Sequence, residues 1–194
     1  MQMKRSCVLT VAIVIAGAVA QSNAQQSPSK SSKPSFQFAD VPYFHRWSKG
    51  QQHEFTPAGQ EDLAKRSDMV TVNIYSSARD GDALAAQANA VLENYKKHNA
   101  RVLRTDSLPR TADRPAEHFI AVVFGRPEFI EVAFARFRLA DGAGSSVIYS
   151  HRIYGEKGGD KASEWLKANG PKLEQTLMSW STMPSPASRG SQAL

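Results

Sequence analysis

Histidines are the residues of this sequence whose chemistry suits both metal binding and general acid–base catalysis, because imidazole titrates near neutral pH. The five stand at positions 45, 53, 98, 118 and 151. The His-Glu-x-x-His zinc motif is absent, since His53 is followed by Glu-Phe-Thr-Pro. We therefore predict no metal site and no cofactor, and we expect histidines that are hydrogen-bonded locally. His45, His53 and His151 remain ligand-binding candidates, which converge only if the early part of the chain packs against residues 145–154.

Other spacings typical of catalysis are missing as well. Ser150 and His151 are adjacent, so on a strand they point to opposite faces and cannot form a direct relay. Gly-x-Ser-x-Gly does not occur, and the glycine-containing run 141–144 precedes an extended segment rather than a helix, unlike a phosphate-binding loop. The glutamates at positions 54, 117, 128 and 131 show no pairing of the kind that glycosidases use. No motif identifies a reaction.

Arginines give the sequence a second kind of candidate site. Arg136 and Arg138 are two residues apart in an extended segment and share one face, and Arg152 follows in the next extended segment. Guanidinium groups on a sheet can hold carboxylate or phosphate groups with two hydrogen bonds. The alternative interpretation is that these arginines form salt bridges with the acids at positions 106, 113, 117 and 131.

An aromatic and basic segment at residues 43–47 has two interpretations. It is either a recognition loop, with His45, Arg46 and Trp47 exposed to a ligand, or a hydrophobic plug that closes one end of the sheet. In the first interpretation it forms a binding surface together with Arg152 and Tyr154.

Hydrophobic periodicity predicts the elements that must position these side chains. Alternation predicts a strand at 69–75, and Asp80 is placed to cap a helix over 83–99 with an apolar stripe. Further strands are expected at 53–56, 101–106 and 118–124, a long hairpin at 129–139 and 145–154, and a helix at 161–181. Gly158-Gly159-Asp160 is expected to cap this last helix, and Gly170-Pro171 to kink it or divide it in two.

These elements predict an α+β fold: an antiparallel sheet of five or six strands with a long C-terminal hairpin, packed against two main helices. Segment 118–124 has no polar face, so helices are expected on both faces of the sheet. The predicted core consists of the valines 72, 91 and 122, the leucines 92, 166 and 173, Ile74 and Phe134.

The first 24 residues predict a cleavable signal peptide. Lys4 and Arg5 precede the apolar run 8–20, which is shorter than the ~20 residues of a membrane-spanning helix, and Ser22-Asn23-Ala24 provides small residues for cleavage. Residues 25–35 are expected to be a disordered linker, 36–182 a single domain and 183–194 a disordered tail. The protein is therefore expected to be secreted or periplasmic, with no transmembrane segment after processing.

The layout resembles the PsbP-like alpha-beta-alpha sandwich, which is frequent among exported proteins. Three segments, 44–47, 54–57 and 149–155, also resemble signature segments of an uncharacterised bacterial secreted family. The resemblance implies a role in binding or assembly, and it implies no catalytic residues.

Taken together, the sequence favours an exported, non-catalytic binding or assembly module for a cell-envelope component or another anionic ligand. The net charge of +6 is too small for the basic patch of a nucleic-acid-binding protein. The alternative is a histidine-dependent enzyme, or a metal-binding protein, of a type that the motifs do not identify.

We predict that the mature protein begins at Gln25, because Ser22 and Ala24 are the small residues that signal peptidase requires. Intact-mass measurement of the secreted protein tests this. A mass that includes residues 1–24 would contradict the prediction.

Overall fold

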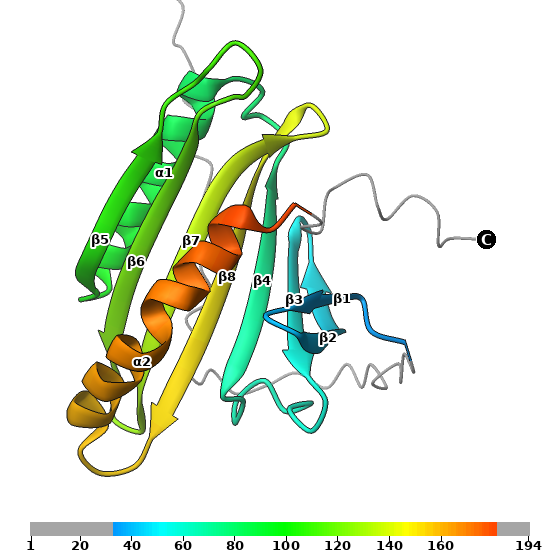
Figure 1. The fold of residues 1–194 in the computed structure, drawn as a ribbon. Helices are drawn as coiled ribbons and strands as arrows, with labels where there is room; N and C mark the ends of the chain where they lie inside the picture. The colour runs from blue at the N-terminus through cyan, green and yellow to red at the C-terminus, as the bar shows by residue number, and fades with distance from the viewer. Residues whose placement is uncertain (1–32, 182–194) are drawn as a thin grey trace, which may run out of the picture.

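Eight antiparallel strands form one sheet in this computed structural model, which describes residues 33–181 (Figure 1). The sheet order is β1-β2-β3-β4-β8-β7-β6-β5. The strands are β1 (Phe36–Phe38), β2 (Val41–Lys49), β3 (Gln52–Pro57), β4 (Asp68–Tyr75), β5 (Arg101–Leu108), β6 (Glu117–Gly125), β7 (Phe129–Ala140) and β8 (Ala143–Tyr154). The helices are α1 (Gly81–Lys97) and α2 (Gly158–Ser179).

The prediction of five or six strands is wrong, because β1 and β2 were not recognised. β1 has only three residues, too few for an alternating pattern. In β2 the pairing register with β3 shifts between His45 and Trp47, so the alternation of side chains breaks in the middle of the strand. The six strands expected from periodicity are all present, and the long hairpin is β7–β8.

The two helices cover opposite faces of the sheet, as the apolar character of β6 predicts. Asp80 caps α1 by accepting a hydrogen bond from the Ala83 N–H at 2.8 Å. Buried residues of α1, among them Leu84 and Val91, pack on Ile120, Val122 and Phe137. Residues of α2 pack on the other face.

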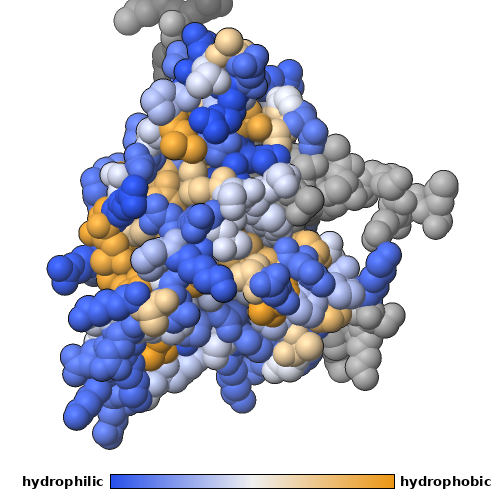
Figure 2. Space-filling model, in the orientation of Figure 1, coloured by the Kyte–Doolittle hydropathy of each residue, from blue (hydrophilic) through white to orange (hydrophobic). Residues whose placement is uncertain are grey.

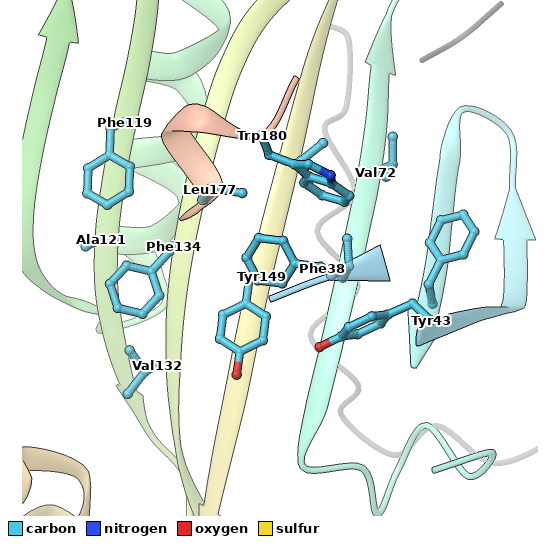
Figure 3. Close-up of a cluster of buried hydrophobic side chains, with 13 residues drawn as sticks. Phe38, Tyr43, Val72, Phe119, Ala121, Val132, Phe134, Tyr149, Leu177 and Trp180 are labelled. Atoms are coloured by element: carbon cyan, nitrogen blue, oxygen red, sulfur yellow. The ribbon is translucent and has the colours of Figure 1, made fainter. Parts of the chain in front are cut away.

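An aromatic cluster fills the space between α2, β1 and the sheet (Figure 3). The ring centroid of Phe38 lies 5.0 Å from that of Trp180 and 5.3 Å from that of Tyr149. Tyr43 of β2 stacks on Phe36 and is 2% exposed. The short strand β1 is therefore held in place by its aromatic side chains as well as by its antiparallel pairing with β2.

Helix α2 runs without interruption through Pro171, so of the two expected outcomes, a kink or a division into two helices, the division is wrong. Pro171 is exposed, and its ring therefore meets solvent rather than the sheet. Gly170, the preceding residue, is buried, and a Cβ added there would lie 3.9 Å from the ring of Phe134. The expectation that Gly158-Gly159-Asp160 caps this helix is wrong: these residues form its first turn, and the N-cap is Lys157 in a left-handed conformation without a side-chain cap.

The predicted core is correct at its centre and wrong at its margin. Val72, Val91, Val122 and Phe134 are buried. Ile74, Leu92, Leu166 and Leu173 are half-buried, and the three leucines pack as partly exposed side chains against the two core clusters.

The surface seen from the α2 side is mostly hydrophilic, with small scattered hydrophobic areas (Figure 2). Large exposed hydrophobic residues in the described part of the chain are Val41, Leu103 and Tyr154. Neither helix within residues 33–181 is both long enough and apolar enough to span a membrane. The predicted signal peptide and tail, and almost all of the predicted linker, lie outside the described residues.

We expect Val122→Ala to lower the free energy of unfolding by about 2–4 kcal/mol, because the side chain is fully buried between β6 and α1. Leu92→Ala is the matched comparison, since Leu92 is half-buried and its loss leaves a site that solvent can fill. Denaturant unfolding measures both. Equal losses in the two variants would show that the assignment of the α1 core is wrong.

Candidate functional site

Arg136 lies buried at the C-terminal end of α2. Its Nε and Nη2 donate to the two carboxylate oxygens of Glu117 at 2.7 and 3.0 Å. Its Nη1 donates to the carbonyl oxygens of Leu177 and Trp180 at 2.9 and 3.1 Å. The last carbonyls of a helix have no partner within the helix and carry partial negative charge, so this cation stabilises the helix end. The salt-bridge interpretation is confirmed for Arg136.

Arg152 and Tyr154 fasten the connection between β3 and β4 to the β7–β8 hairpin. Arg152 donates from Nε to Glu131 at 3.1 Å and from Nη1 to the carbonyl oxygen of Ala64 at 3.1 Å. The Tyr154 hydroxyl donates to the carbonyl oxygen of Arg66 at 2.9 Å. The salt-bridge interpretation is therefore confirmed for Arg152 too. A ligand that used either side chain would first have to break these contacts.

Glu131 is the centre of this second ionic cluster, because Arg66 also donates to it, at 2.8 Å. Burial would raise the pKa of the Glu131 carboxyl, but the charges and hydrogen bonds of Arg66 and Arg152 outweigh burial and lower the pKa. The Nη1 of Arg66 and the hydroxyl of Ser150 are buried without a hydrogen-bond partner in the described part of the chain.

Residues 43–47 belong to strand β2, so the interpretation of this segment as a loop is wrong. Arg46 donates to the Thr56 hydroxyl at 2.9 Å, to the carbonyl oxygen of Pro57 at 3.0 Å and to Glu61 at 3.1 Å. Its guanidinium also lies over the ring of Phe44. Trp47 is half-buried. Arg46 therefore joins β2 to the end of β3 and the turn that follows.

Arg138 differs from the other candidate arginines because its guanidinium has no ion pair or hydrogen bond among residues 33–181. The residue is half-buried, and its Nε is buried with no hydrogen-bond partner within the described ranges. Burial lowers the pKa of Arg138, and the positive charge of Arg136 on the same face lowers it further. Glu117 and Asp141 act in the opposite direction, but neither contacts the guanidinium.

His151 is oriented by two neighbours, Asp68 and Trp165, at the other end of the α2 face. Its Nδ1 lies 2.9 Å from a carboxylate oxygen of Asp68, which also accepts from the Tyr149 hydroxyl at 2.7 Å. The ring stacks on Trp165 of α2, with centroids 4.2 Å apart and an angle of 4° between the planes. No hydrogen bond to Nε2 is present among the described residues. Burial would raise the pKa of Asp68, but the hydrogen bonds from His151 and Tyr149 outweigh it and lower the pKa.

The structure brings His45 and His53 together and leaves His151 apart from them. The rings of His45 and His53 are 6.2 Å apart, and the Ser48 hydroxyl lies 2.6 Å from a nitrogen of each. His53 pairs with Val72, and His151 pairs with Asp68, four residues away along β4, a separation of about 13 Å. Ser48 gave no signal in the sequence, because alternation in an unbroken strand places it on the face opposite His45.

The remaining histidines are hydrogen-bonded locally, as predicted. His98 contacts the carbonyl oxygen of Asn94 at the end of α1, and His118 contacts the Ser107 hydroxyl, each at 2.8 Å. Within the described part of the chain, no three histidine, cysteine or acidic side chains gather closely enough to hold a metal ion.

No protein-family profile matches the chain, and no curated protein sequence is significantly similar to it. Among solved structures, the Ran-binding protein Mog1p of Saccharomyces cerevisiae has a TM-score of 0.46 and 10% identity, covering 71% of this chain and 85% of that one. PA94, a Pseudomonas aeruginosa protein of unknown function, has a TM-score of 0.41 and 13% identity, covering 78% and 88%. No role is transferred from them to a residue of this chain. The resemblance to the PsbP-like sandwich stays a prediction.

We predict that Asp68 makes stability depend on pH in the acid range. Its pKa is lower in the folded protein than the ~3.9 of an unfolded chain, so its contribution is present above that value and lost as pH falls toward the folded pKa. Asp68→Asn should therefore flatten the decline of unfolding free energy between neutral pH and pH ~3. Urea unfolding at several pH values measures this. The exposed Asp113→Asn is the control, and an equal flattening in both variants would contradict the prediction.

Proposed function

We propose that this protein is an exported, non-catalytic binding module that captures an anionic group, a carboxylate or a phosphate, through Arg138. The observation that carries the proposal is the half-buried guanidinium of Arg138 without a partner among residues 33–181. Export is proposed from the predicted signal peptide, and a cell-envelope component is the proposed source of the anion.

The first argument is energetic. A cation withdrawn from water without a partner destabilises the folded protein, and an anion that binds it recovers part of that cost. The acid nearest to Arg138 along the sheet cannot fill this role, because both oxygens of Glu117 are occupied by Arg136. An external anion therefore gains more at Arg138 than at the arginines whose hydrogen bonds are already made within the protein.

The second argument is positional. Arg138 pairs with Ser145 of β8 and lies on the same face as Arg136, beside the C-terminal end of α2. Among residues 33–181, the carboxylate that contacts one of these two guanidinium groups is Glu117, which Arg136 engages, and Asp141 acts on Arg138 without contact. Bidentate recognition of a planar or tetrahedral anion is the chemistry that guanidinium groups perform best.

We expect Arg138→Gln to weaken capture of the secreted protein by cell-envelope fractions by about tenfold or more, since a hydrogen bond to a charged group contributes about 1.5–3 kcal/mol. Sedimentation with washed envelope fractions over a series of salt concentrations measures this, and the variant should also lose salt sensitivity. Adding free phosphate or acetate to the wild type as competitor distinguishes the two anion classes.

Arg101→Gln is the matched control, because Arg101 is an exposed arginine at the edge strand β5. It should leave capture unchanged. Unfolding of the Arg138→Gln variant should require the same or more denaturant, because an unpaired half-buried charge has been removed. Capture that is indifferent to Arg138→Gln would overturn the proposed function.

A second candidate function is acid–base chemistry by His151, and one observation favours it. Asp68 holds Nδ1 and Trp165 holds the ring, so Nε2 is directed by two contacts, which is how enzymes orient a general base. The capture measurement separates the two functions, because His151→Asn leaves capture unchanged if Arg138 is the binding residue.

A further inference from the structure

A β-bulge places three side chains with metal-binding chemistry on one face of the β2–β3 hairpin. His45 pairs with Phe55, but Trp47 pairs with Glu54, so Arg46 is the additional residue in β2. After this additional residue, the side chains of β2 point to the faces opposite to those that unbroken alternation would give. Ser48, which pairs with His53, therefore lies on the same face as His45. Without the bulge, Ser48 would point to the opposite face. Bulges are frequent next to functional sites, where they redirect a side chain in this way.

The three side chains converge on one point. The Ser48 hydroxyl oxygen lies 2.6 Å from Nε2 of His45 and 2.6 Å from Nδ1 of His53. The two nitrogens are therefore no more than about 5 Å apart, whereas ions such as Zn²⁺ bind imidazole nitrogens at about 2.0–2.1 Å. A movement of the rings by about 1 Å at most would bring both nitrogens into the coordination distance of one ion.

The protons of this cluster also allow a metal ion to replace the two hydrogen bonds that Ser48 makes with the histidines. Ser48 has a single hydroxyl proton, so it donates to one imidazole and accepts an N–H from the other. A bound ion would replace both hydrogen bonds, and the imidazole that donated would carry its proton on its other ring nitrogen. No residue has to lose a proton to solvent at neutral pH if both rings are neutral.

We propose that His45 and His53, with the Ser48 hydroxyl or a water molecule, form a binding site for a divalent transition metal, with Cu²⁺ bound more tightly than Zn²⁺. Imidazole ligands suit both ions, and the general order of affinities places Cu²⁺ above Zn²⁺. Among residues 33–181 the ion would have two nitrogen ligands, from His45 and His53, and the Ser48 hydroxyl, water or an external ligand would complete its coordination. This site is independent of Arg138 and of the proposed function.

The test is titration of the secreted protein with CuSO4 and with ZnCl2, in which isothermal titration calorimetry measures binding. Electron paramagnetic resonance of the Cu²⁺ complex then identifies the ligands. We expect one ion per chain, nitrogen splitting from two imidazoles, and release of the ion on acidification, when protons compete for the rings. His45→Gln and His53→Gln should each weaken metal binding by more than about a hundredfold, because each removes a direct ligand. Loss of a residue that only orients a ligand weakens binding by about 10–100-fold.

His98→Gln is the matched control, because His98 is exposed at the end of α1 and should leave binding unchanged. Circular dichroism checks that each variant is folded. Ser48→Ala should retain one ion with a smaller loss than either histidine variant. Absence of binding, or binding that survives both His45→Gln and His53→Gln, would overturn the proposal.

Discussion

The antiparallel pairing of β4 with β8 is the contact on which the rest of the structure depends. It joins strands β1–β4 to strands β5–β8 within the one sheet, and the register runs over eight residue pairs from Asp68–His151 to Tyr75–Gly144. Gly144 permits the close approach at one end, where its N–H donates to the Ala78 carbonyl oxygen and an added Cβ would lie 2.8 Å from the Ala78 side chain. At the other end, Asp68 binds Tyr149 and His151. We call this pairing of β4 with β8 the seam. It fixes the positions of the strands that carry the candidate sites on its two sides.

Most buried charged side chains in the described part of this protein form ion pairs that connect secondary-structure elements. Arg136 and Glu117 hold the end of α2, while Arg66, Arg152 and Glu131 hold the connection between β3 and β4. Removing one member of such a pair leaves the other charge buried without compensation, which is why these pairs keep the secondary elements in place. Arg138 differs from these paired arginines, because its half-buried charge is not compensated by a contacting acid in the described ranges. It lies in a similar environment, but its guanidinium is left without a partner among residues 33–181.

The two proposed binding sites lie on separate parts of the sheet face that α2 covers. Arg138, near the end of α2, has the charge to recognise an anion, and the histidines of the β2–β3 hairpin have the nitrogens to bind a metal ion. His151 belongs to neither group, because Asp68 and Trp165 fix it beside the seam. The sites differ in the residue that they need, so variants at one leave the others intact, and each function can be tested alone.

The sequence by itself determined the elements whose patterns are local. Alternation in β4, the Asp80 cap of α1 and the turn between β7 and β8 depend only on neighbouring residues, and these expectations are confirmed. Tertiary structure alone decided which charges meet, since Glu117 and Arg136 are nineteen residues apart, and Asp68 and His151 eighty-three. It also decided β2, where the bulge at Arg46 breaks the alternation that periodicity requires. Because a bulge is fixed by pairing with another strand, no local pattern revealed that Ser48 and the two histidines share a face.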